Sequence, residues 1–231
     1  MIYYDFHIHS CLSPCANDDM TPNNIINMAY LKELDCIAIC DHNSTHQQIA
    51  VSKIDSPIKV LYGIEVETSE EVHVLGLFED IEKNQEFGKW VENNLNDIKN
   101  DPKFFGNQLI LNENDETIGT YDTLLLQSIK ASLNETIDKI HECKGAVILA
   151  HVLDRKNSIT YQLGFIPKGI KADALEVKSI EEINKVKQDA PYLEDYLFVI
   201  DSDAHQLIDI SEKENQLSSI EFERLLRPCK I

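Results

Sequence analysis

Residues 2–9, IYYDFHIH, join a run of strand-forming residues to two histidines one residue apart. Ile, Tyr and Phe favour β-strands. Side chains of a strand alternate between its two faces, so we expect His7 and His9 to project together from the strand's carboxyl end. Two imidazoles on one face can share a metal ion. The alternative is a pair of polar residues that merely end a strand, and the rest of the chain decides between the two.

Short apolar runs alternate with helical patterns along the rest of the chain. Residues 36–40, CIAIC, are typical of a strand buried on both faces. This alternation over 231 residues favours one α/β domain, residues 1–231, built as a parallel barrel or a layered sheet. Further strands are expected at 58–67, 72–78, 146–151, 173–177 and 197–201.

Helix start signals punctuate these strands. Thr21 followed by Pro22 is typical of an N-cap and first helical position. Capping-box patterns predict helices that begin at Ser44 and at Ser132. A helical pattern also covers residues 80–100, whereas residues 101–120 fit a loop or hairpin insert that decorates the domain.

Composition narrows the class of protein. The formal charge of −19 and the lack of a basic cluster disfavour broad nucleic-acid binding. No apolar run approaches the ~18 residues of a membrane span, and no basic start precedes an apolar run. We therefore expect a cytoplasmic protein without a membrane partner. The six cysteines are expected to be reduced thiols, and the oligomeric state stays open.

Histidines and carboxylates gather where the expected strands end. In α/β barrels that face carries the functional site. A His-rich set with few carboxylates suits Zn, Mn or Fe better than Mg or Ca, and clustered divalent ions favour a metal-assisted hydrolase. The remaining two histidines, His46 and His141, fall in helical patterns and are expected at the surface. The gathered residues are His7, His9, Asp41, His42, Glu65, His73, His151, Asp203 and His205.

These motifs resemble, in order, those of the polymerase and histidinol phosphatase (PHP) superfamily of metal-dependent phosphoesterases. The resemblance covers nearly the whole chain and is strongest to free-standing members, including enzymes that cleave nucleoside phosphates. The motifs are HIH at 7–9, DH at 41–42, GIEVE at 63–67, VHVLG at 72–76, AH at 150–151 and DSDAH at 201–205.

The resemblance implies a distorted (β/α)7 barrel, similar to a TIM barrel, with a trinuclear site of two to three divalent ions. It implies hydrolysis of a small phosphate ester, such as a nucleotide, sugar phosphate or amino-alcohol phosphate, by a metal-bridged hydroxide. Glu65, Asp203, His205 and Asp41 are the expected catalytic residues. By motif, His7, His9, Glu65 and Asp203 would hold the first ion, Glu65, His73 and His151 the second, and His42 and His205 the third.

One stretch departs from the family pattern. Residues 10–22, SCLSPCANDDMTP, are longer and rearranged where the family supplies an Asp or His to the third ion. Asp19 is the favoured ligand because it lies nearest Thr21, and Asp18 is an alternative. Cys15 is a less favoured thiolate ligand.

Three cations could contact the substrate phosphate: Arg155 and Lys156 after the His151 strand, and Lys168. A solvated loop is the competing interpretation of each, since surface cations are common. Three rival functions remain: an amidohydrolase, a nuclease-like or short-oligonucleotide phosphodiesterase, and a metal-bound regulatory module without catalysis.

Overall fold

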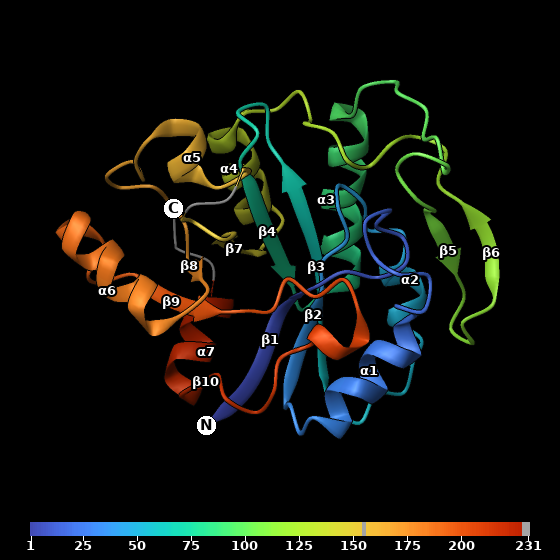
Figure 1. Ribbon diagram of the computed structural model, residues 1–231, viewed down its shortest axis with the longest axis horizontal. Coiled ribbons are helices and arrows are strands. Elements are labelled where there is room, and N and C mark those ends of the chain that lie inside the picture. Colours follow the sequence, from blue (N-terminus) through green and yellow to red (C-terminus); the bar gives the residue numbers. More distant parts are fainter. Residues whose placement is uncertain (154–155, 228–231) are drawn as a thin grey trace.

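The computed structural model describes residues 1–153 and 156–227. One eight-stranded sheet, in the order β10-β1-β2-β3-β4-β7-β8-β9, curls into a distorted TIM-like barrel of a single domain, with helices outside it (Figure 1). The strands of this sheet are β1 (Ile2–Ile8), β2 (Cys36–Ile39), β3 (Lys59–Glu67), β4 (His73–Phe78), β7 (Ala146–Leu149), β8 (Ala174–Val177), β9 (Leu197–Ile200) and β10 (Gln216–Leu217).

The helices begin largely where the sequence predicted. Thr21 caps the first helix by accepting a hydrogen bond from the Asn24 amide, and Ser132 forms the expected capping box with Glu135. The helix predicted from Ser44 is wrong, because the helical turn begins only at Gln48. The helices are α1 (Pro22–Leu31), α2 (Gln48–Val51), α3 (Ile81–Asn94), α4 (Leu133–Glu142), α5 (Ile159–Leu163), α6 (Ile180–Asp189) and α7 (Ser219–Leu226), with 3-10 turns at Pro191–Leu193 and Leu207–Asp209.

The expectation of parallel strands is wrong for β4. This strand runs antiparallel to both neighbours, β3 and β7. Residues 68–72 between β3 and β4 form a turn in which the Thr68 amide donates to the Val72 carbonyl at 3.0 Å. A parallel crossover needs a dozen residues or more, so this short connection allows only a hairpin. As a result His73 begins β4, directly opposite Glu67 at the end of β3.

The chain after β9 closes the barrel against β1. Ala204 pairs with Ile8 in a parallel bridge, and the His9 amide donates to the Ala204 carbonyl at 2.9 Å. Asp201 accepts a hydrogen bond from the Phe6 amide at 2.6 Å. These contacts bring the segment that follows β9 against β1, beside the His7–His9 pair.

Alternation of side chains builds the core on both faces of β2, as the CIAIC run predicted. Cys36 and Cys40 pack in one apolar cluster, and Ile37 and Ile39 pack in another together with residues of α1. His141 is a correction to the sequence analysis. It is buried rather than superficial, and its Nε2 lies 2.9 Å from an oxygen of Asp173.

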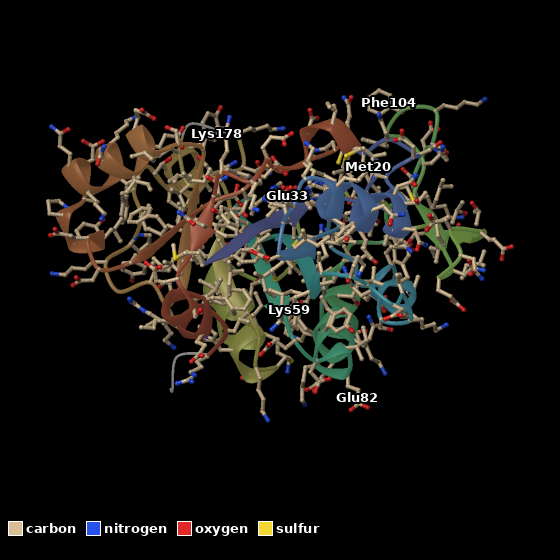
Figure 2. The ribbon with its side chains drawn as sticks, turned by 90° about the horizontal axis from the view of Figure 1, so that it is seen from below. Met20, Glu33, Lys59, Glu82, Phe104 and Lys178 are labelled. Atoms are coloured by element: carbon tan, nitrogen blue, oxygen red, sulfur yellow. The ribbon has the colours of Figure 1, made fainter. Side chains whose placement is uncertain are left out.

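The segment 101–120 contains a separate hairpin, β5 (Leu109–Leu111) and β6 (Thr117–Thr120), at the edge of the molecule beyond α2 (Figure 1). Strands β1 and β3 run upward in Figure 1, and β4 runs downward between β3 and β7. Figure 2 shows the molecule from below, with Lys59, which begins β3, near the middle of the view, Phe104 and Lys178 toward one edge, and Glu82 at the opposite edge.

Candidate metal centre

Four side chains converge above the end of β1. His7 Nε2 lies 3.2 Å from His9 Nε2. Glu65, from β3, places Oε1 3.3 Å from His7 Nε2 and Oε2 3.4 Å from His9 Nε2. Asp203, from the closing segment, places Oδ1 3.2 Å from His9 Nε2. Three separate parts of the chain thus supply one group of nitrogen and oxygen donors, the type that binds borderline transition metals.

Glu65 also faces a second group. His73 Nδ1 lies 2.7 Å from Glu65 Oε1, and His151 Nε2 lies 3.3 Å from His73 Nδ1. His151 follows β7, whereas His73 arrives from the opposite strand direction on β4. The reversed β4 therefore brings His73 to the same carboxylate that the first group shares.

The nitrogen and oxygen atoms of these two groups lie close together, but their geometry does not suit hydrogen bonds between them. Glu65 is 1% exposed, and neither of its oxygens has a hydrogen bond of acceptable geometry, despite the ring nitrogens at 2.7–3.5 Å. Among the described residues, His73 Nε2 and His151 Nδ1 are also buried without a hydrogen-bond partner. Burying a carboxylate without hydrogen bonds is costly, and divalent ions between the donors would satisfy both oxygens. The residues present therefore fit divalent metal ions.

A third group contains Cys15. Donor atoms of His9, Cys15, His42 and His205 all lie within 4.8 Å of one another. Asp18 and Asp19 are exposed and belong to no such group among the described residues, and Asp18 accepts a hydrogen bond from Asn107 Nδ2 at 2.9 Å. The structure thus places Cys15, and not Asp19, beside the two histidines. Cys15 is exposed at the cavity wall, where partial loss of solvent would raise the pKa of its thiol, but the charge of His42 and a hydrogen bond with His205 lower it to about 6.

Three hydrogen-bond acceptors fix the ring orientations of His7, His9 and His205. His7 Nδ1 donates to Glu176 Oε2 at 2.8 Å, which leaves Nε2 facing the centre. His205 Nδ1 donates in the same way to the Asp203 carbonyl at 2.8 Å. His9 Nδ1 lies 3.1 Å from Ser13 Oγ. Sequence reasoning missed Glu176 and Ser13. A carboxylate within the otherwise apolar ALEV strand was the available signal for Glu176.

Asp41 has a different place from the one expected of a catalytic group. It is fully buried, and it does not line the cavity over the centre. Its carboxylate accepts hydrogen bonds from Ser10 Oγ at 2.6 Å and from Ser13 Oγ at 2.7 Å. We therefore propose that Asp41 positions His9 through Ser13 instead of acting on a leaving group.

Two of the gathered residues adopt a strained backbone. His151 has φ +30° and Asp203 has φ +54°, in the left-handed region that disfavours residues with a Cβ. Such conformations cost about 1–3 kcal/mol each and persist where the surrounding structure imposes them. Both side chains owe their direction into the centre to these turns.

A cavity of about 640 Å³ opens above the three groups. Lys156 lines it, whereas Lys168 is exposed and is not among the residues that line it. Arg155 lies outside the described residues. Sequence reasoning missed Glu67, which ends β3 and lines the cavity. It also missed lining residues from loops whose course no local pattern gives: Glu71, Leu126 and Asn157.

In the protein without metal, attraction between the histidines and the carboxylates determines which of these side chains are charged. Burial would raise the pKa of Asp203 and of Glu65, but the neighbouring histidines hold both well below the ordinary carboxyl range. Burial would lower the pKa of His42 and of His73, but Glu65 raises both. In the protein without metal, protonated His42 and His73 thus supply the positive charge that bound ions would supply.

The metal-free protein should therefore lose stability as pH rises. His42 and His73 have raised folded pKa values, so their contribution is complete below about 6.5 and is lost above it as they deprotonate. His9 takes no part in this contribution, because burial and the charge of His42 lower its pKa to about 3. The carboxylates have depressed values, so their contribution is complete above about 4. The lowered pKa of the Cys15 thiol adds stability as pH rises, so the test uses Cys15→Ser, which lacks this opposing contribution. We expect the melting temperature of this variant in chelator to fall as pH rises above about 6.5, and to stay level when metal is bound. A chelator-treated protein that gains stability over this range would contradict the charge assignment.

Solved structures with this fold are known, although no protein-family model and no curated protein matches the sequence. Endonuclease Q from Pyrococcus furiosus superposes with a TM-score of 0.63 at 18% identity, over 89% of this chain and 49% of that one. A complex of endonuclease Q with an abasic-lesion duplex gives 0.63 at 20%, over 90% and 50%. A Bifidobacterium adolescentis protein assigned as a metal-dependent phosphoesterase gives 0.61 at 17%, over 96% and 95%.

Fold and centre together define a distorted TIM-like barrel with a donor cluster fitted for divalent metal ions. The chain spans about half the length of the endonuclease Q chains that it matches, and nearly all of the phosphoesterase-type chain. Among the described residues, no helix has the length and apolar character required to cross a membrane.

Proposed function

We propose that this chain is a metal-dependent phosphoesterase that hydrolyses a small phosphate ester. One observation carries the proposal: the buried carboxylate of Glu65 lies unsatisfied between two groups of histidines, on the floor of a cavity, in a PHP-type barrel. We propose that two to three ions of Zn, Mn or Fe bind there. A cytoplasmic location accords with the composition.

The roles of the chain's own residues follow from their positions. Bound ions would supply an activated water and neutralise charge on the phosphoryl oxygens. Glu65 and Asp203 hold the negative charge that attracts these ions. Lys156, on the cavity wall, would bind a phosphoryl oxygen or the far end of the substrate. His205, whose side chain is 30% exposed, would hold an ion at the rim, where the substrate can reach it.

The cavity favours a small substrate. Its volume of about 640 Å³ matches the 300–1,000 Å³ typical of small-molecule sites. Apart from histidine, Lys156 is the only cationic side chain among the described residues that line it, and Glu67 and Glu71 add negative charge. A polynucleotide track usually carries many cations, and this chain has a formal charge of −19.

A nuclease is the second candidate, and the structural neighbours favour it as strongly. One matching structure is described as a lesion-specific endonuclease, and another holds a duplex with an abasic lesion at the active site. The match reaches only about half of those chains. Activity on single-stranded or lesion-bearing DNA is therefore an outcome to be tested alongside small esters.

The test is a substrate panel with the metal-loaded protein. It should contain mononucleotides, sugar phosphates, amino-alcohol phosphates, short oligonucleotides and a duplex with an abasic site. Phosphate release from a monoester would support the proposal, and cleavage of the oligonucleotides or the duplex alone would establish the nuclease. Bound metal without hydrolysis of any member would favour a regulatory module, and hydrolysis of amides alone would favour an amidohydrolase.

Replacing Glu176 by glutamine should weaken metal binding without unfolding the barrel. Glutamine can still accept from His7 Nδ1, but it lacks the charge that makes the imidazole a stronger donor. Loss of such a supporting carboxylate typically costs about 10–100-fold in metal affinity or activity. Isothermal titration with Zn measures the change. Glu181→Gln, an exposed carboxylate on α6, is the matched control, and equal affinities in both variants would refute the role of Glu176.

A further inference from the structure

We propose that Cys15 is a thiolate ligand, and that Cys15, His42 and His205 form a softer metal site than the other two in the same centre. This inference rests on the proposed metal centre and adds the chemical selectivity of one of its sites. The other two groups offer only imidazoles and carboxylates, so the three sites are chemically unequal.

Counting the ring nitrogens that are not already hydrogen-bonded shows which ion each histidine can bind. His9 belongs to both the first and the third group, but its Nδ1 lies 3.1 Å from Ser13 Oγ, and one remaining nitrogen binds one ion. Its Nε2 lies 3.2 Å from both His7 Nε2 and Asp203 Oδ1, which assigns it to the first group. The third group then keeps Cys15, His42 and His205, and His42 links it to the group of Glu65 and His73, to which it also belongs.

Contacts within the loop hold Cys15 at this place. The Asn17 amide donates to the His205 carbonyl at 3.0 Å, which ties the loop of Cys15 to the segment of His205. Gly106 packs against the loop from outside, because a Cβ at this glycine would lie 2.0 Å from the Pro14 carbonyl oxygen. Its φ of +106° also favours glycine. The segment before the β5–β6 hairpin therefore buttresses the cysteine.

A buried carboxylate oxygen without a hydrogen bond lies beside this group and is independent evidence for an ion. Glu65 Oε2 lies 3.0 Å from His42 Nδ1 and has no hydrogen bond. His42 itself is 6% exposed, so solvent gives this pair little relief. A cation held by the third group would stabilise the carboxylate oxygen that faces it.

A sulfur ligand changes which ion the site prefers. Thiolate and imidazole donors suit Zn and related late metals, whereas oxygen donors suit Mg and Mn. The third site should therefore reject Mn and Mg more strongly than the sites around Glu65. Cys15 is also exposed at the cavity mouth, so its ion is the one most open to exchange.

Cobalt(II) titration of the metal-free full-length chain tests this assignment. A thiolate bound to cobalt gives an intense near-ultraviolet charge-transfer band that imidazole and carboxylate ligands do not give. We expect this band in the unaltered chain and in the control Asp19→Asn. We expect Cys15→Ser to lose the band and to keep cobalt in the two sites around Glu65.

A competition experiment adds a second readout. Cys15→Asp should restore a third ion with an oxygen ligand, and its preference for Zn over Mn should fall by about tenfold or more relative to the unaltered chain. A band that persists in Cys15→Ser would overturn the inference. Cobalt that binds without any charge-transfer band would also overturn it and leave the metal centre standing. Failure to bind cobalt at all would overturn both the inference and the proposed function.

Discussion

Replacing Glu65 by glutamine should abolish phosphoester hydrolysis and remove metal from the centre. Glu65 is the one carboxylate that lies against His7 and His9 on one side and against His73 on the other. Loss of a single electrostatic group in an active site lowers turnover by about 10²–10³-fold. Replacing a residue shared by two ions should lower turnover by at least that factor. Elemental analysis should show fewer ions per chain, together with the loss of turnover.

The control for this variant is Glu86→Gln. Glu86 pairs with Lys83 on the surface of α3, where an ion pair contributes little to stability or function. Far-ultraviolet circular dichroism should match the unaltered chain in both variants. Full hydrolysis by Glu65→Gln, or full metal content, would show that Glu65 is not a ligand shared by two ions.

Metal removal is the second change with a large expected effect. Ions that bind only the folded chain stabilise it by about 4 kcal/mol per site at a thousandfold excess over the dissociation constant. For a chain of this size, 1 kcal/mol corresponds to about 2–4 °C in melting temperature. Chelation should therefore lower the melting temperature by roughly 8–16 °C for each tightly bound ion. Differential scanning calorimetry with and without chelator measures the change.

The Glu65→Gln variant serves as the reference for that experiment. It should respond to chelator far less than the unaltered chain, since it has fewer ions to lose. Addition of Zn or Mn to the chelated, unaltered protein should restore both the melting temperature and hydrolysis. A melting temperature unchanged after complete metal removal would show that no ion is bound tightly to the folded state.

Local sequence patterns predicted the strands, most helix starts and the position of the donor residues at strand ends. Alternation in IYYDFHIH put His7 and His9 on one strand end, and the buried CIAIC run located β2. The reversal of β4 was missed, although the five residues between the two strands are too few for a crossover. That reversal explains how His73 reaches Glu65 from the beginning of a strand instead of its end.

Contacts between distant segments were beyond local patterns. The preference for Asp19 rested on its distance along the chain from Thr21, but the turn at residues 13–16 places Cys15 beside His42 and His205. Glu176 and Ser13 act through hydrogen bonds to ring nitrogens that face away from the centre. His141 was expected at the surface because its helical pattern gave no sign of Asp173 beneath it.

The measurement that tests the central claim most directly is phosphoester hydrolysis by the metal-free protein as Mn or Zn is added in known equivalents. The claim is that ions held around Glu65 hydrolyse a phosphoester. We expect no turnover without metal, a steep rise as the sites around Glu65 fill, and a plateau at two to three equivalents. A protein that binds these equivalents without hydrolysing any phosphoester, or that hydrolyses one equally well in chelator, would contradict the claim.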